Sequence, residues 1–127
     1  MHRIFDHIDL RVANVEASRA FYDAFLTAVG FGETAVDDSG LLIYCRRIDG
    51  RIAEVVTLIE DAQHDPCKTR LAFGAASRDD VDRITKIAVA AGATAVEAPA
   101  ACPEYSPTFY AAFFNDPDGN ALEVVYR

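Results

Sequence analysis

The order of predicted elements repeats within this chain of 127 residues, and the repeat restricts the fold more than any other feature. Apolar residues alternate along residues 4–12, recur every three or four positions along 15–29, and form three further strand-like runs. Asn14 is a suitable N-cap for the helix, and Gly30 is a suitable stop. One β-α-β-β-β unit is therefore predicted, with elements at Ile4–Val12, Val15–Val29, Gly30–Val36, Leu41–Ile48 and Arg51–Ile59.

A second unit with the same order follows the turn-forming residues at 61–66. Three prolines fall within residues 98–107, which are therefore predicted to form a loop. The predicted elements are a strand at Arg70–Ala76, a helix at Asp79–Ala91, a short strand at Thr94–Glu97, and strands at Thr108–Asn115 and Asn120–Tyr126. We name residues 1–62 module one and residues 67–127 module two. Since the length suits one ordinary domain, we expect the modules to form a single domain over residues 1–127.

The last hairpin carries the clearest candidate for a functional side chain. The sequence Asp-Pro-Asp-Gly-Asn at residues 116–120 predicts a tight turn between two apolar strands, and the returning strand contains one carboxylate, Glu123. A carboxylate in a buried strand needs a cation, a hydrogen-bond donor or a proton. Glu123 is therefore a candidate catalytic residue, and an ion pair with Arg70 is the structural alternative.

The repeat assigns a counterpart to Glu123, although two alignments give different answers. The string D-G-x-x-x-E-V-V occurs at residues 49–56 and again at 118–125, and it aligns Glu54 with Glu123. The alignment of the first strands places Arg70 over His7, and when continued it pairs Glu60 with Glu123 instead. We take Glu54 as the expected counterpart because Glu60 falls near a strand end.

Charge and composition narrow the classes of partner. Twelve Lys and Arg against 20 Asp and Glu give a net charge of −8, which argues against nucleic acid and anionic membranes and favours a small-molecule ligand. No signal-like N-terminus or long apolar segment is seen, so the protein is expected to be cytoplasmic. Cys45, Cys67 and Cys102 are widely spaced and are expected to be buried or half-buried thiols.

Three stretches of the chain resemble the vicinal oxygen chelate superfamily, which includes glyoxalase I, bleomycin-resistance proteins, fosfomycin-resistance enzymes and type I extradiol dioxygenases. They are D-H-I-D-L-R-V at 6–12 leading to S-R-A-F-Y at 18–22, R-L-A-F at 70–73, and A-F-F-N-D-P-D-G-N at 112–120 followed by Glu123. The resemblance covers nearly the whole chain. It implies an α+β fold in which two β-α-β-β-β modules form a curled mixed sheet, or cup, with helices on its outer face.

The resemblance also implies a divalent metal inside the cup, such as Mn, Fe, Mg, Zn or Ni. The metal-ligand positions of the superfamily correspond here to His7, Arg70, Glu123 and, by the repeat, Glu54. Arg70 departs from the pattern, because a guanidinium stays protonated and does not ligate metals. That leaves His7, Glu54 and Glu123 as the expected metal ligands. Arg70 is then expected either to form an ion pair that takes the place of the metal or to bind a substrate carboxylate.

Two functions follow from the resemblance. One is a metal-dependent lyase, isomerase or dioxygenase acting on a small molecule with neighbouring oxygens. The other is a metal-free binding protein of the bleomycin-resistance kind. Ser106 also stands where relatives carry a His, so two His positions are lost together, which indicates altered chemistry or none and leaves a purely structural or interaction role as a third alternative. Tyr105 and Tyr110 are expected to join Arg70 in ligand binding, with core packing as the alternative. A homodimer is expected because the modules leave sheet edges exposed.

Overall fold

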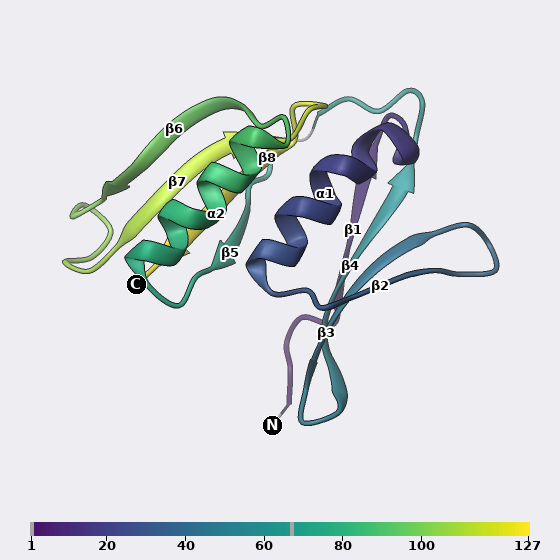
Figure 1. Ribbon diagram of the computed structural model, residues 1–127, viewed down its shortest axis with the longest axis horizontal. Helices are drawn as coiled ribbons and strands as arrows, with labels where there is room; N and C mark the ends of the chain where they lie inside the picture. Colours follow the sequence, from purple (N-terminus) through teal and green to yellow (C-terminus); the bar gives the residue numbers. More distant parts are fainter. Residues whose placement is uncertain (1, 67) are drawn as a thin grey trace.

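The computed structural model describes residues 2–66 and 68–127, so the predicted thiol of Cys67 lies outside the described residues. The predicted β-α-β-β-β order occurs twice, and the α+β fold class is confirmed (Figure 1). The elements of module one are β1 (His7–Val12), α1 (Val15–Val29), β2 (Glu33–Val36), β3 (Leu42–Ile48) and β4 (Arg51–Glu60). Those of module two are β5 (Leu71–Gly74), α2 (Arg78–Ala90), β6 (Thr94–Ala101), β7 (Tyr110–Asn115) and β8 (Ala121–Tyr126).

The largest error in the predicted elements concerns β6. The loop prediction for residues 98–107 was wrong at its start, because β6 continues through Ala101. β6 lies at the edge of its sheet and pairs irregularly with β7, with register shifts on both sides of Glu97. An edge strand with such irregularities accommodates Pro99, since a missing N–H on the outer side breaks no ladder bond.

Each module forms its own four-stranded mixed sheet with the same arrangement. The strand orders are β1-β4-β3-β2 and β5-β8-β7-β6. β1 runs parallel to β4 and β5 runs parallel to β8, whereas the other neighbours are antiparallel. β1 and β5 are therefore corresponding edge strands, and each begins close to a candidate site residue, His7 or Arg70.

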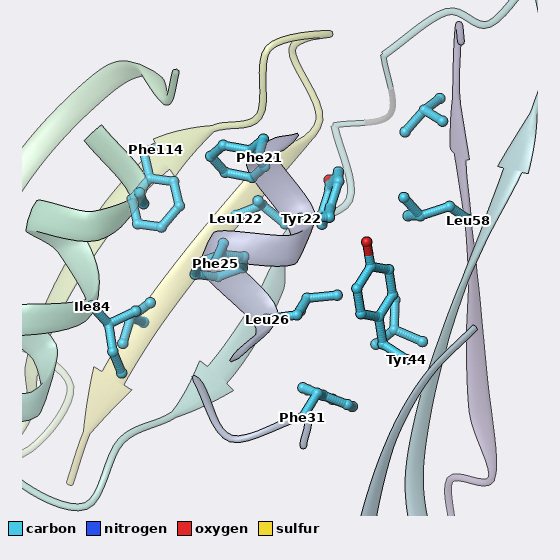
Figure 2. Packing of buried hydrophobic residues seen from close by; sticks show 14 of the residues in the cluster. Phe21, Tyr22, Phe25, Leu26, Phe31, Tyr44, Leu58, Ile84, Phe114 and Leu122 are labelled. Atoms are coloured by element: carbon cyan, nitrogen blue, oxygen red, sulfur yellow. The ribbon is translucent and has the colours of Figure 1, made fainter. Parts of the chain in front are cut away.

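The two sheets share one hydrophobic core, with α1 lying between them (Figures 1 and 2). Phe25 of α1 is fully buried, and its ring lies 5.4 Å from that of Phe73 on β5 and 5.5 Å from that of Phe114 on β7. Leu26, the next residue of α1, belongs to the same cluster as Tyr44 on β3 and Leu58 on β4, which lie on the module-one side in Figure 2. The aromatic residues of α1 therefore join the two modules.

The two helices are defined by ordinary end signals. The Asn14 side chain accepts a hydrogen bond from the Ala17 amide at 2.8 Å, and Gly30 ends α1 with a φ of 128°, as predicted. Ser77 caps α2 through the Asp80 amide. Within the described chain, no helix is long and apolar enough to cross a membrane.

The turn at residues 116–120 is the second connection between the modules. The buried Asp116 carboxylate accepts hydrogen bonds from the Asn120 amide at 2.8 Å, the Asp118 amide at 2.9 Å, the Asn120 side chain at 2.7 Å and the Tyr22 hydroxyl of α1 at 2.5 Å. Asp118 accepts from the Ala13 amide of module one at 2.8 Å. The closing turn of module two is therefore hydrogen-bonded to module one.

The shared core determines where the remaining sheet faces point. Apolar side chains of β1, β3 and β4 and of β5, β7 and β8 all belong to one cluster, so both sheets turn a face toward α1. The opposite, helix-free faces consequently lie on different sides of the molecule. The chain alone therefore holds two separate curved sheets, and it does not close them into one continuous cup.

Candidate functional site

Glu123 lies on the helix-free face of the module-two sheet. Its neighbours in the sheet are Ala72 on β5 and Phe113 on β7, and laterally paired residues share a face. The adjacent residues Leu122 and Val124 are fully buried in the core on the other face. We call the helix-free face around Arg70, Phe109, Phe113, Glu123 and Arg127 the module-two face.

The Glu123 side chain is buried without a close partner. It is only 9% exposed, and within the described chain it takes part in no hydrogen bond and no ion pair within 4.0 Å. Burial raises the pKa of its carboxyl, while the positive charges of Arg70 and Arg127 act in the opposite direction. The direct ion pair with Arg70 that sequence reasoning offered as an alternative is not formed.

Both arginines of this face lie against aromatic rings. The Arg70 guanidinium carbon lies 4.7 Å from the centre of the Phe113 ring, and that of Arg127 lies 5.0 Å from the centre of the Phe109 ring. Sequence reasoning missed Arg127. The alternation of side chains along a strand would have identified it, because Glu123, Val125 and Arg127 lie on one face when the chain is extended.

An apolar cluster extends this face beyond Glu123. Cys102, Phe109 and Ala111 are buried there, with Phe113 and Val125 packed against them. Tyr105 is 64% exposed, and its ring centre lies 4.9 Å from that of Phe109, so the predicted ligand-binding Tyr105 borders the module-two face. The Ser106 hydroxyl oxygen is buried, and among the described residues it has no hydrogen-bond partner.

The thiols follow the expectation where they are described. Cys45 is half-buried and Cys102 is buried, and both are free. Burial raises the pKa of the Cys102 thiol, and the nearby carboxylates Glu104, Glu123 and Glu97 raise it further. A thiol with a raised pKa is a poor nucleophile at neutral pH.

Tyr110 lies away from the module-two face. Its ring packs against the main core, and its hydroxyl donates a hydrogen bond to Asp82 of α2 at 2.7 Å. The Arg78 guanidinium carbon lies 5.0 Å from the centre of its ring. The structure therefore does not bring Tyr110 together with Arg70 and Glu123, and its contacts are those of a residue that joins α2 to the sheet.

His7 lies on the helix-free face of the other sheet. It pairs with Val55 of β4, whereas the next residue, Ile8, pairs with the core residue Val56. The His7 ring is exposed, and its Nδ1 lies 2.8 Å from the Asp6 carboxylate. This hydrogen bond, together with the charge of Asp9, raises the pKa of His7.

The structure places Glu54 on the sheet face opposite to His7. Glu54 pairs with Arg46 on the face that Tyr44 and Val56 occupy, and the Arg46 Nη1 lies 2.8 Å from its carboxylate. The counterpart of Glu123 is instead Thr57. Asp9 pairs with Thr57 in module one as Ala72 pairs with Glu123 in module two.

The length of the first hairpin explains the misplaced counterpart. Thr57 lies seven residues after Gly50, whereas Glu123 lies four residues after Gly119. The D-G strings therefore align the turns but not the middles of the strands. Because these two spacings differ by an odd number of residues, the side chain that the strings align with Glu123 lies on the other face of its sheet.

The positions implied by the resemblance do not supply a metal-binding set. With Thr57 in place of Glu54 as the counterpart of Glu123, they hold one imidazole, one hydroxyl, one guanidinium and one carboxylate, at His7, Thr57, Arg70 and Glu123. A neutral hydroxyl is a weak ligand, and a guanidinium is not a ligand at all. Among residues 2–66 and 68–127, no three His, Cys, Asp or Glu side chains are grouped closely enough to hold a metal ion. The residues present do not fit a resident divalent cation.

A cleft of about 900 Å³ separates the two edge strands β1 and β5. His7, Arg70 and also Glu54 border it, and its apolar lining includes Phe31, Phe73 and Ile84. Ile4 and Phe5, in the segment that precedes β1, are 87% and 80% exposed. Unpaired strand edges and exposed apolar side chains thus occur together at the junction of the modules.

Replacement of Glu123 by glutamine tests whether the ionised Glu123 carboxylate destabilises the folded protein. A carboxyl with a raised folded-state pKa binds its proton more tightly when folded, so stability falls as pH rises through that pKa. We expect Glu123→Gln to raise the melting temperature at pH 8, with the gain shrinking as pH falls toward 4. Thermal unfolding followed by circular dichroism across this range measures the effect. Asp65→Asn, in an exposed loop, controls for the loss of one negative charge. A lower melting temperature for Glu123→Gln at every pH would contradict the assignment.

Comparison with known proteins gives a consistent family assignment. The family model described as "Glyoxalase/Bleomycin resistance protein/Dioxygenase superfamily" matches residues 4–124. A glyoxalase/bleomycin resistance protein from Albidiferax ferrireducens is 26% identical, with a TM-score of 0.77, and the match covers 98% of this chain and 99% of that one. A search of curated proteins finds no match.

Two more distant structures share the fold. A glyoxalase-related enzyme from Fulvimarina pelagi is 21% identical, with a TM-score of 0.69, and the match covers 99% of this chain and 89% of that one. The fosfomycin resistance protein FosX from Listeria monocytogenes is 20% identical, with a TM-score of 0.67 and coverage of 98% and 90%. That structure is of a FosX mutant in complex with Mn(II) and 1S,2S-dihydroxypropylphosphonic acid.

Proposed function

The chain belongs to the glyoxalase/bleomycin resistance protein/dioxygenase superfamily, and from this premise we propose that it binds a small molecule on the module-two face without a resident metal ion. The observation that carries the proposal is the Glu123 carboxylate, which belongs to a residue only 9% exposed and has no hydrogen bond or ion pair within the described chain. Its oxygens still reach solvent, so a ligand or a partner chain can replace water there and satisfy a carboxylate whose burial is otherwise unfavourable. Its neighbours Arg70 and Arg127 add two hydrogen-bond donors of fixed charge.

The donor set supports the metal-free form of the proposal. Arg70 stands at one of the four positions where the resemblance implies metal ligands, and strand pairing gives Thr57, in place of the expected Glu54, as the counterpart of Glu123. Arg70 also brings a positive charge near Glu123, where it would repel a cation by a few kcal/mol at short range and intermediate dielectric. The FosX complex motivates the idea of a small-molecule ligand, while the residues of this chain argue against its metal.

We further propose that a second copy of the chain completes the site. The helix-free faces that carry His7 and Glu123 lie on different sides of the shared core, so one chain presents two half-cups. The edge strands β1 and β5 and the exposed Ile4 and Phe5 offer a surface for a two-fold partner. In such a dimer, His7 of one chain would face Arg70 and Glu123 of the other.

Native mass spectrometry of protein purified without chelator tests the metal-free site and the dimer in one measurement. The expected spectrum shows a dimer, about twice the 13.8 kDa chain mass, without stoichiometric metal. One metal ion per chain, lost in both Glu123→Ala and His7→Ala, would overturn the metal-free reading and favour a metal-dependent lyase, isomerase or dioxygenase. A monomer at micromolar concentration would overturn the shared site.

A further inference from the structure

The module-two face combines groups of opposite charge around one buried carboxylate. Glu123 lies between Arg70, which precedes the neighbouring strand, and Arg127, four residues further along its own chain. Both arginines act on the Glu123 carboxyl through their charge, yet neither takes part in an ion pair within 4.0 Å in the described chain. The face thus presents cationic donors and an anionic acceptor side by side, without one neutralising the other directly.

The rings beneath the arginines restrict how a ligand can approach. A guanidinium stacked on an aromatic ring has that face covered, so its N–H groups point outward along its edges. These edges match the two oxygens of a carboxylate or a similar anion. Arg70 is exposed and takes part in no ion pair within 4.0 Å in the described chain, so its edge is accessible to a ligand.

Glu123 requires the complementary group. An ionised carboxylate only accepts hydrogen bonds, so a ligand that reaches it must bring a hydroxyl or an ammonium group. An anionic group at the same point would be repelled by Glu123, and repelled further by Glu97 and Glu104 on the side of Cys102. The anionic end of a ligand is therefore directed to Arg70 and its donor end to Glu123.

The apolar cluster determines the third part of the ligand. Phe109 is buried and Phe113 half-buried, and the exposed ring of Tyr105 lies at the border of the same surface. These side chains offer an apolar and aromatic wall next to the charged groups. A ligand of purely polar character would leave the exposed Tyr105 ring in contact with water.

Resting on the proposed function, we infer that the ligand is a small organic acid that carries a hydroxyl or ammonium group next to its anionic group and an apolar or aromatic body. Arg70 binds the anion, Glu123 accepts from the neighbouring donor, and the exposed Tyr105 ring and the accessible part of Phe113 pack against the body. These three contacts define the ligand class, and none of them involves a metal ion.

Three probes separate these contacts. They are 3-phenyllactate, 3-phenylpropanoate, which lacks the hydroxyl, and 3-phenyl-1,2-propanediol, which lacks the carboxylate. Isothermal titration calorimetry on the full chain is expected to show 3-phenyllactate binding about tenfold or more tightly than either of the others, the effect of one charge-assisted hydrogen bond. Arg70→Gln should abolish the advantage over the diol, and Glu123→Gln should reduce the advantage over 3-phenylpropanoate.

Lys86→Gln, on the exposed side of α2, is the matched control for loss of a positive charge and should leave all three affinities unchanged. Equal affinities for the three probes, no binding by any of them, or an unchanged preference in Arg70→Gln would overturn the ligand class. The proposed function has a separate test, because it fails on metal content or subunit mass in the native mass spectrum.

Discussion

Replacement of Asp116 by alanine is expected to destabilise the protein by about 3 kcal/mol or more, which corresponds to a fall in melting temperature of roughly 10 °C. The Asp116 carboxylate accepts four hydrogen bonds, from the Tyr22 hydroxyl, two amides of its own turn and the Asn120 side chain. Its loss leaves buried donors without acceptors and removes a connection between the modules. Urea unfolding monitored by far-ultraviolet circular dichroism measures the change.

Two variants make the Asp116 result interpretable. Asp38→Ala, in the exposed turn between β2 and β3, should change the unfolding free energy by no more than about 0.5 kcal/mol. Tyr22→Phe removes one of the four donors and should cost about 1 kcal/mol. If Asp116→Ala were as mild as Asp38→Ala, the turn would not stabilise the contact between the modules.

Replacement of Phe25 by alanine is the second large effect, with an expected loss of about 3 to 5 kcal/mol. The fully buried Phe25 ring contacts Phe21 in its own helix, Phe73 on β5 and Phe114 on β7. The cavity would open where α1 packs between the two sheets (Figure 2). Because both modules share this cluster, we expect one cooperative transition at lower urea concentration and no separate unfolding of the modules.

A graded pair of variants checks that core volume causes this loss. Phe25→Leu keeps most of the buried volume and should cost less than half as much as Phe25→Ala. Val89→Ala, at an exposed position of α2, should stay within about 0.5 kcal/mol of the wild type. Two resolved transitions in Phe25→Ala, or a loss below about 1 kcal/mol, would contradict the single shared core.

Most of the secondary structure was predictable because its signals are local. The period of apolar residues identified both helices, and Asn14 and Gly30 marked the ends of α1. Alternation along the first strand placed His7 and Ile8 on opposite faces, and the structure bears this out. The strand β6 escaped prediction because an irregular edge strand tolerates the proline that would disrupt a central one.

The candidate site was predictable only in part. The burial of Glu123 followed from its apolar neighbours, and its counterpart was wrongly placed at Glu54 because the first hairpin extends further beyond the shared part of the sheet. Strand pairing decides that Thr57 is the counterpart, and pairing depends on hydrogen bonds between segments that the repeat alone does not specify. The position of Tyr110 away from Arg70 and Glu123 was not predictable for a related reason, since its partner Asp82 comes from a helix distant in the chain.

The sequence by itself determined that this chain contains two β-α-β-β-β modules and that its closing strand buries one carboxylate. Both properties depend on the order and spacing of neighbouring residues, which local backbone geometry turns directly into helices, strands and faces. Only the tertiary structure decided that α1 packs between the two sheets, that their helix-free faces lie apart, and that Glu123 stands near two arginines without pairing with either. Those outcomes depend on how segments far apart in the chain pack in space, and no short stretch of sequence contains that information.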